Sequence, residues 1–208
     1  DNRLFPWPNY GSTATPFYTI LCLWIGGYML SILLGTEVHA EEGEEEYKRY
    51  EVYFGRMALF VLIGIFQAIV ASMGVLLLLK VYAVHPVMFV FYAIFVSIVF
   101  MVMIYTAVSL FGHGGIVIGI VLLVVQVAAS SANFPIEVNP RMFQIIYPYL
   151  PFTYAINGMR QIMAGIVYSI LLKDIAVLMI FMIVSLIIGI TFKKVSNKCI
   201  KPFVDKLK

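Results

Sequence analysis

Five stretches of this 208-residue chain contain no Lys, Arg, Asp or Glu, and they constrain its fold more than any other feature. They cover residues 16–35, 57–79, 86–111, 116–132 and 175–192. A helix needs about 20 apolar residues to cross the hydrocarbon core of a bilayer. Each stretch is close to that length, so the sequence predicts five transmembrane helices.

The composition of the chain agrees with a membrane protein. Hydrophobic residues make up 62% of it and charged residues 12%, whereas a soluble domain is roughly one quarter charged. A soluble domain of this size cannot bury so much apolar surface, which excludes a soluble enzyme, a nucleic-acid-binding module and a disordered tail. In lipid, helices satisfy their own backbone polar groups. We therefore predict an all-α integral membrane protein that is surrounded by the lipid bilayer and has no nucleic-acid partner.

The distribution of Lys and Arg predicts the orientation. One side of the membrane holds nine of them: Lys48, Arg49, Arg56, Lys193, Lys194, Lys198, Lys201, Lys206 and Lys208. The other side holds five: Arg3, Lys80, Arg141, Arg160 and Lys173. Cytoplasmic segments carry the excess of positive charge, so we predict that loop 36–56 and the basic tail 193–208 are cytoplasmic. Five crossings then place the amino end, residues 1–15, outside.

The external segment 133–174 is moderately apolar and is interrupted by four prolines. Proline removes a backbone donor and disfavours a helix through the preceding residue, so no part of this segment is long enough to span. We predict a re-entrant or interfacial hairpin of two short helices, since irregular backbone at membrane depth must be covered by protein or line a cavity. The hairpin either connects two spans or shapes a substrate exit. Its candidate residues are Pro135, Tyr147, Pro148, Pro151, Tyr154, Asn157 and Arg160.

The predicted cytoplasmic loop 36–56 contains seven Glu and three basic residues. Glu44 and Glu45 each precede a basic residue by four positions, and aromatic residues recur at helical spacing up to Phe54. This pattern predicts a short amphipathic helix parallel to the membrane, which docks a cytoplasmic partner. One alternative is a solvated acidic linker. Another is that the acidic cluster 41–46 is flexible and only residues 47–55 are ordered.

Two amides, Gln67 and Gln126, fall near the middle of their predicted spans. A buried amide in lipid needs a partner, so each either packs by bonding across helices, which is the favoured interpretation, or lines a polar path. The sequence has no HExxH motif, no GxSxG motif and no phosphate-binding glycine loop. The histidines lack metal-ligand spacing, and Asp174, at the edge of the last span, lacks the second Asp of an aspartyl protease. We therefore expect no catalytic site, metal or cofactor, and any ATPase must be a separate chain.

Several segments resemble the YhgE/Pip family, the phage infection proteins of Gram-positive bacteria. They are NYGSTATPFYTILCLWIGG near the start, YEVYFGR with the following Gln67, and the HPV that begins at His85. The most specific is NFPIEVNPRMFQIIYPYLPFTYAINGMRQIMAGI, where the family has a similar FP…P…F…PxxPFTYA…G.R pattern. The resemblance covers nearly the whole chain.

The resemblance implies a fold like that of type-2 ABC transporter permeases, with a large extracellular insertion after the first span. The chain then holds the second to sixth spans, and residues 1–15 are the end of an ectodomain that lies outside it. Loop 36–56 corresponds to the loop where such permeases dock their ATPase, and 133–174 to the re-entrant segment before the last span. The coupling residues implied by position are Tyr47, Lys48, Arg49, Tyr50, Phe54 and Arg56.

The resemblance also implies a function. We expect a homodimer in a bacterial plasma membrane, whose ectodomain serves as a phage receptor or a bacteriocin target. One alternative is an active exporter permease that works with a separate ATPase subunit. Another is a membrane scaffold of a type VII-like secretion system, whose membrane component is similar in plan.

Overall fold

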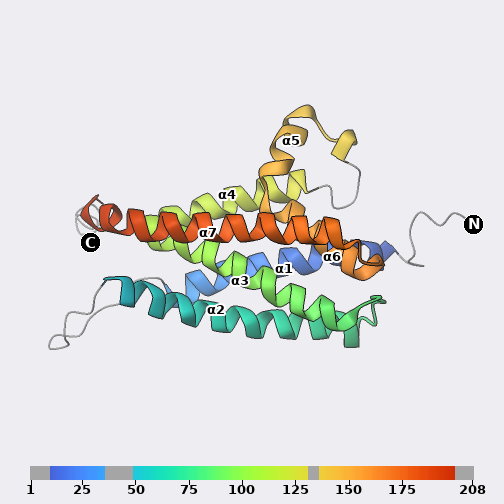
Figure 1. The fold of residues 1–208 in the computed structure, drawn as a ribbon. Helices are drawn as coiled ribbons and strands as arrows, with labels where there is room; N and C mark the ends of the chain where they lie inside the picture. The colour runs from blue at the N-terminus through green and yellow to red at the C-terminus, as the bar shows by residue number, and fades with distance from the viewer. Residues whose placement is uncertain (1–9, 36–48, 131–135, 200–208) are drawn as a thin grey trace, which may run out of the picture.

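The structure, a computed structural model, describes residues 10–35, 49–130 and 136–199, and within these ranges it contains helices and turns but no strand. Five long helices lie side by side (Figure 1): α1 (Tyr10–Leu34), α2 (Arg49–Met73), α3 (Pro86–Phe111), α4 (His113–Ala129) and α7 (Tyr168–Cys199). By length and composition, 4 of these helices can cross a membrane, and α4 is a shorter apolar helix. The predicted all-α membrane fold is confirmed.

Successive long helices run in opposite directions, so α1 begins and α7 finishes at opposite ends of the bundle (Figure 1). We call the end that contains Leu34, residues 49–56 and Phe111 the coupling end. The other end contains loop 79–85 and the short helix α6 (Pro151–Ala164), and we call it the re-entrant end.

Proline and glycine set several helix boundaries. Pro86 is the first residue of α3, a position where the missing N–H has no helical acceptor to lose. Gly112 ends α3 with a φ of 54°, a left-handed conformation that glycine adopts without strain. α2 instead continues into a π-helical turn, η1 (Gly74–Leu78), which the Leu79 N–H closes by donating to the Gly74 carbonyl at 3.2 Å. These breaks produce the short connections on either side of α3.

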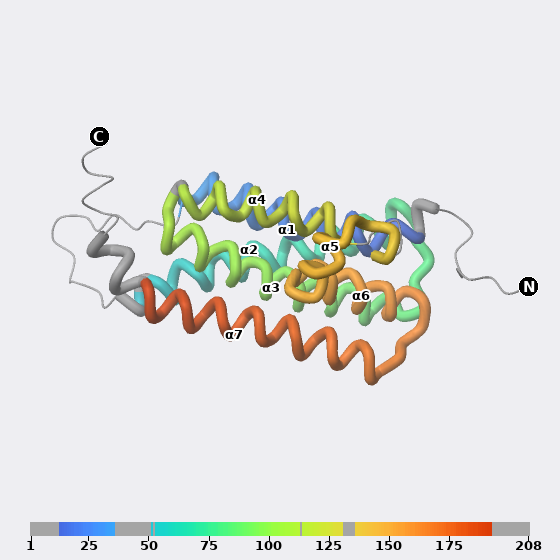
Figure 2. The backbone as a smooth tube through the Cα atoms, turned by 90° about the horizontal axis from the view of Figure 1, so that it is seen from above, coloured from blue at the N-terminus to red at the C-terminus, as the bar shows by residue number. Residues whose placement is uncertain are grey.

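α3 lies at the centre of the bundle and packs against α1, α2, α4, α6 and α7. Seen from above, it lies between α4 and α7 (Figure 2). A helix that is apolar around its whole circumference is one that other helices surround. The ring centroid of Trp24 on α1 lies 4.8 Å from that of Phe100 on α3 and 5.4 Å from that of Phe152 on α6, both in edge-to-face geometry. The core therefore includes a helix that does not span.

The outer helices present apolar side chains to their surroundings. Leu62 and Phe66 on α2 and Ile187 on α7 are each more than half exposed. In a bilayer this surface faces lipid chains that are as apolar as the side chains themselves, so it carries no hydrophobic penalty.

Between α4 and α7 the chain folds into a re-entrant segment. It consists of η2 (Ile136–Val138), α5 (Arg141–Ile146), η3 (Tyr147–Tyr149) and α6. α5 projects from the side of the bundle, whereas α6 lies within it against α1, α3 and α7 (Figures 1 and 2). The two short helices correspond to those of the predicted hairpin, and protein covers α6 on several sides.

The starts of three helices differ clearly from the prediction. α1 begins at Tyr10 and not at residue 16, so Pro16 lies inside the helix. α7 begins at Tyr168 and not at residue 175, because Lys173 and Asp174 are polar but do not break a helix. Residues 49–56 form the first turns of α2 and not a separate helix parallel to the membrane, since no proline interrupts the helix through Met73. The rest of loop 36–56 up to residue 48 lies outside the described residues.

Candidate functional site

Four of the six implied coupling residues lie at the start of α2. Arg49 is its first residue and Tyr50 its second, but the side chains of both lie outside the described set. Tyr47 and Lys48 lie outside the described residues altogether. Phe54 is 40% exposed at the coupling end, where a partner can reach it.

Arg56 ties the start of α2 to the end of α1. Its Nη2 donates to the Leu34 carbonyl at 2.6 Å and to the Gly35 carbonyl at 3.3 Å. The last carbonyls of a helix have no partner within it and carry the negative end of the helix dipole, so a guanidinium here satisfies them and is electrostatically favoured. Arg56 therefore acts as a clamp between two spans.

Close to Arg56 in the sequence, hydrogen bonds of buried hydroxyl groups join α2 to α3. The sequence did not predict these bonds. The hydroxyl oxygens of Tyr53 and Thr106 lie 2.8 Å apart, and the Tyr105 hydroxyl donates to the Tyr53 carbonyl at 3.1 Å. The ring of Phe60 packs on that of Tyr105 with centroids 5.1 Å apart. Satisfied buried hydroxyls hold two helices in one register. The one sequence signal was Tyr53 within the YEVYFGR motif.

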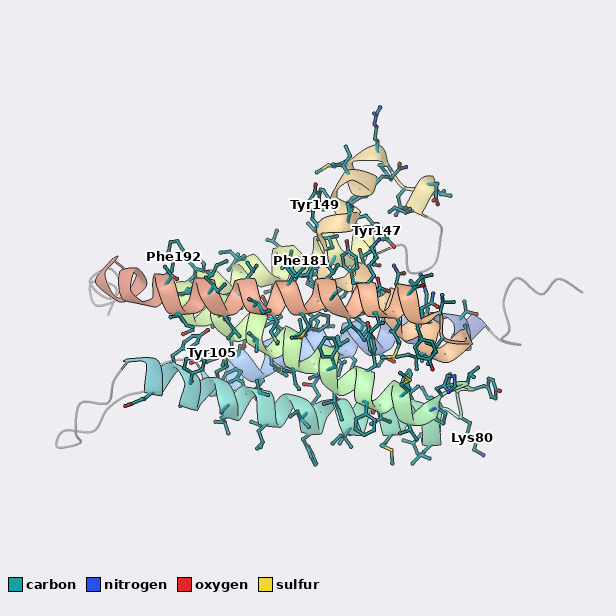
Figure 3. All side chains as sticks on the ribbon, viewed as in Figure 1. Lys80, Tyr105, Tyr147, Tyr149, Phe181 and Phe192 are labelled. Atoms are coloured by element: carbon teal, nitrogen blue, oxygen red, sulfur yellow. The ribbon has the colours of Figure 1, made fainter. Side chains whose placement is uncertain are left out.

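The far end of α2 is connected to the re-entrant segment. Loop 79–85 follows η1, and the Val84 N–H donates to the Met163 carbonyl near the end of α6 at 3.2 Å. Lys80 has a φ of 49°, which is uncommon for a residue with a Cβ and marks the turn. Figure 3 shows Lys80 at one end of the bundle and Tyr105 towards the other. A backbone hydrogen bond therefore joins the loop after α2 to α6.

The described hairpin residues bond mainly to one another, from α6 back to η3. Thr153 Oγ1 donates to the Tyr147 carbonyl at 2.8 Å, and the Tyr154 hydroxyl donates to the Pro148 carbonyl at 2.7 Å. Asn157 Nδ2 donates to the Tyr147 hydroxyl at 3.4 Å. These bonds fix the corner between α5 and α6, where Figure 3 shows Tyr147 above the α7 ribbon.

α3 holds α6 inside the bundle. The Tyr92 hydroxyl donates to the Tyr154 carbonyl at 3.1 Å. A Cβ on Gly158 would collide with the Tyr92 hydroxyl, so the close approach of the two helices requires glycine at this position. Pro151 begins α6 and is buried, and Pro135 lies outside the described residues.

The predicted intramembrane amides have different surroundings. Gln67 Nε2 donates to the Cys22 carbonyl at 3.1 Å and joins α2 to α1. Gln126 on α4 is fully buried, and neither of its amide atoms has a hydrogen-bond partner among the described residues. Arg160 on α6 is half-buried and has an interaction partner. Of the two amides, Gln67 is the one that links helices within the described part of the chain.

Asp174 lies inside α7, six residues after the helix begins at Tyr168, and not at the edge of the last helix. Its side chain is 4% exposed, and its Oδ2 has no hydrogen-bond partner among the described residues. The helix that carries it packs against α3 and α6. Apolar residues continue on both sides of Lys173 and Asp174, and this pattern indicates that the helix extends through the two residues.

The described residues enclose apolar space. A cavity of about 210 Å³ lies between α1, α3, α4 and α7, with Trp24, Tyr28, Gly119 and Ser185 in its wall. In the described ranges, no group of three His, Cys, Asp or Glu residues is placed to hold a metal ion. The arrangement is that of a helical bundle with polar contacts between helices at its two ends.

Comparison with known families defines the class of this protein. The family described as ABC-2 type transporter matches residues 44–164, which include α2 with its coupling-end contacts and the whole described re-entrant segment up to the end of α6. The match covers more than half of the chain. The chain therefore belongs to the ABC-2 type transporter family.

A curated relative gives a more specific likeness. The uncharacterized protein YhgE of Bacillus subtilis (strain 168) is 28% identical over 192 residues, or 92% of this chain. The alignment covers 24% of YhgE, so the chain spans about a quarter of the length of this relative. The predicted YhgE/Pip-like, ABC-2 permease-like domain is confirmed. No solved structure gives a significant match.

Proposed function

We propose that this chain is the membrane domain of an ABC-2 type permease, driven from the coupling end by a separate ATPase subunit. Permeases of this family usually act with a separate ATPase, and this chain has no phosphate-binding glycine loop of its own. One observation carries the proposal: α2 is clamped at its start to α1 through Arg56 and to α3 through Tyr53. A partner that moves the start of α2 therefore moves three spans.

The length and stiffness of α2 support this coupling. Its 25 residues extend about 37 Å at 1.5 Å per residue, which is more than the hydrocarbon thickness of a bilayer. At its far end, loop 79–85 is bonded to α6 through the Val84 N–H. We propose that motion at the coupling end reaches α6 by this route, and that α6 shapes the substrate exit.

Purification of the complete protein in mild detergent tests the proposal. We expect an ATPase subunit to co-purify, and its ATP turnover to fall several-fold in Arg56→Ala, because the clamp between α1 and α2 is lost. Leu62→Ala is the matched control, since Leu62 lies on the same helix but is exposed to lipid. Absence of any ATPase subunit, or equal turnover in the two variants, would overturn the proposal.

We also propose that the chain forms homodimers in a bacterial plasma membrane, with its amino end outside and its carboxyl end cytoplasmic. The excess of Lys and Arg on one side and the alternating helix directions support this orientation. Tags at the two ends should be accessible from opposite faces of the membrane. Tags accessible from the same face would contradict the orientation, and a single-copy mass in native mass spectrometry would contradict the dimer.

A second candidate function is that of a receptor for phage or bacteriocin, and the length of the relative favours it. Most of YhgE lies outside the aligned region, and an extracellular recognition domain would lie there. Deletion of that part of the full protein should block infection while the membrane domain still folds, and unchanged infection would exclude the receptor. Co-purification with secretion-channel proteins in place of an ATPase would instead favour the secretion scaffold.

A further inference from the structure

Asp174 is a buried acid within a helix that is long and apolar enough to cross the membrane. It lies in the segment Tyr168–Phe192, is 4% exposed, and keeps one carboxylate oxygen without a hydrogen-bond partner in the described part of the chain. An ionised carboxylate that is desolvated and incompletely hydrogen-bonded is costly, and such residues within spans generally have functional roles. Neither the family match nor the relative assigns a role to this residue.

The groups around Asp174 come from both helices that pack against this part of α7. α3 contributes Tyr92, and α6 contributes Tyr154. The Tyr92 hydroxyl already donates to the Tyr154 carbonyl at 3.1 Å, and the Tyr154 hydroxyl already donates to the Pro148 carbonyl at 2.7 Å. Both tyrosine protons are therefore committed elsewhere.

The one charged group near Asp174 on its own helix is Lys173. Consecutive residues on a helix point about 100° apart, and Lys173 is exposed where Asp174 is buried. Lys173 is therefore free to extend its ammonium group towards the interface. The Asp174 carboxyl remains enclosed between α3 and α6.

We propose that the Asp174 carboxyl is a proton-binding site whose occupancy controls how tightly α6 is held against α3 and α7. A bound proton removes the charge and converts the carboxylate, which can only accept hydrogen bonds, into a group with one O–H donor. Loss of the proton leaves a carboxylate that requires water, and water enters only if the contact between α6 and α7 loosens. Asp174 lies six residues after Tyr168, about 9 Å along the helix, so the aqueous phase at the re-entrant end is close enough for proton exchange.

The surroundings favour a proton over a metal cation. Hard cations such as Ca²⁺ take six to eight oxygen ligands, and Mg²⁺ demands a near-ideal octahedron. The described residues contain no group of three His, Cys, Asp or Glu residues that could share a metal ion with Asp174. A single enclosed carboxyl offers far fewer oxygen ligands than either cation takes, so the site favours a proton.

Labelling of the wild-type protein with an apolar carbodiimide tests the site and needs no known transport activity. Dicyclohexylcarbodiimide reacts with protonated carboxyls in apolar surroundings. The acid proton moves to a carbodiimide nitrogen, the carboxyl oxygen bonds to the central carbon, and an O-to-N acyl shift gives an adduct that contains all atoms of both reactants. We expect mass spectrometry to locate the adduct at Asp174, with at least a fivefold decrease in labelling from mildly acidic to mildly alkaline medium. Exposed Glu137 is the internal control and should react with a water-soluble carbodiimide instead.

Hydrogen exchange tests the consequence for α6. After correction for intrinsic exchange rates, the α6 amides should exchange faster in alkaline medium in the wild type. Asp174→Asn, which keeps the shape of the neutral acid, should remove this pH dependence, and exposed Lys173→Gln should keep it. No labelling of Asp174, labelling that does not change with pH, or protection by sodium ions at constant pH would overturn the proton site. A pH dependence that persists in Asp174→Asn would overturn the control of α6, whatever the result of the ATPase experiment.

Discussion

At the coupling end, side-chain hydrogen bonds run between neighbouring spans, whereas at the re-entrant end they run mostly within one short segment. Arg56 on α2 donates to the Leu34 carbonyl of α1, and the Tyr53 hydroxyl on α2 is hydrogen-bonded to Thr106 on α3. These contacts link three helices. The hairpin instead bonds α6 to η3, and α6 is held in the bundle mainly by aromatic packing and by Tyr92. The difference indicates that the coupling end moves as a unit and that α6 is the element able to shift.

Buried polar side chains add to this contrast. At the re-entrant end the Asp174 carboxyl keeps an oxygen without a partner among the described residues. At the coupling end both buried tyrosine hydroxyls are partnered, and the Arg56 Nε, which has no partner among the described residues, belongs to a guanidinium whose Nη2 makes two hydrogen bonds. Satisfied buried hydrogen bonds make a region rigid.

Phe152→Ala should have the largest effect on stability. The variant removes the ring that packs on Trp24 and stacks on Phe100, with centroids 5.4 and 5.5 Å away, and leaves a cavity in the core. We expect a loss of about 3–5 kcal/mol, measured by equilibrium unfolding in mixed micelles. Phe91→Ala is the control, because that ring is 68% exposed to lipid. Equal losses for the two variants would mean that α6 is not part of the core.

Gly158→Ala should destabilise the protein by about 1–3 kcal/mol, the usual cost of overpacking. The added methyl group would collide with the Tyr92 hydroxyl. The penalty should therefore shrink when the same change is made in a Tyr92→Phe background, and a double-mutant cycle of thermal unfolding in detergent measures the coupling. Additive effects would show that α6 does not approach α3 as closely as described.

Arg56→Ala should cost about 1–2 kcal/mol, since it removes charge-assisted hydrogen bonds to the end of α1. Arg56→Lys keeps the charge, but its side chain is shorter and its ammonium reaches the two carbonyls less well, so it should recover part of the loss. Pulse proteolysis in detergent provides the unfolding free energy. Full stability in Arg56→Ala would contradict the clamp.

The two intramembrane amides should give the smallest effects, in opposite directions. Gln67→Leu breaks the bond to the Cys22 carbonyl and should cost about 0.6 kcal/mol, the average for interhelical hydrogen bonds in membranes. Gln126→Leu removes a buried amide that has no partner among the described residues, so stability should be unchanged or slightly higher. Chemical unfolding in matched micelles compares them, and a larger loss for Gln126→Leu would show that this amide has a partner.

The sequence predicted the spans because charge-free apolar runs have few other stable arrangements. It predicted the hairpin as well, since Pro148 and Pro151 exclude a continuous helix through 133–174. It did not predict that α7 begins at Tyr168, because the pair Lys173 and Asp174 resembles a polar boundary when tertiary contacts are unknown. Only packing against α3 and α6 shows that one of the two is exposed and the other buried.

The candidate coupling contacts were less predictable than the helices. Arg56 was singled out by position, but its acceptor at Leu34 lies on another helix, and the Tyr53 and Thr106 hydroxyls meet across 53 positions in the chain. Such long-range pairs depend on how the helices are rotated against each other, and nearly uniform apolar spans contain little information on that rotation. α3 is an example, because it is apolar on every face.

We propose that motion at the start of α2 reaches α6. Hydrogen exchange of the complex with its ATPase measures this coupling. Addition of ATP should change the exchange of amides in residues 151–164 in the wild type, and Arg56→Ala should abolish most of that change while Leu62→Ala preserves it. An α6 whose exchange does not respond to ATP, or responds equally in Arg56→Ala, would contradict the coupling between the two ends.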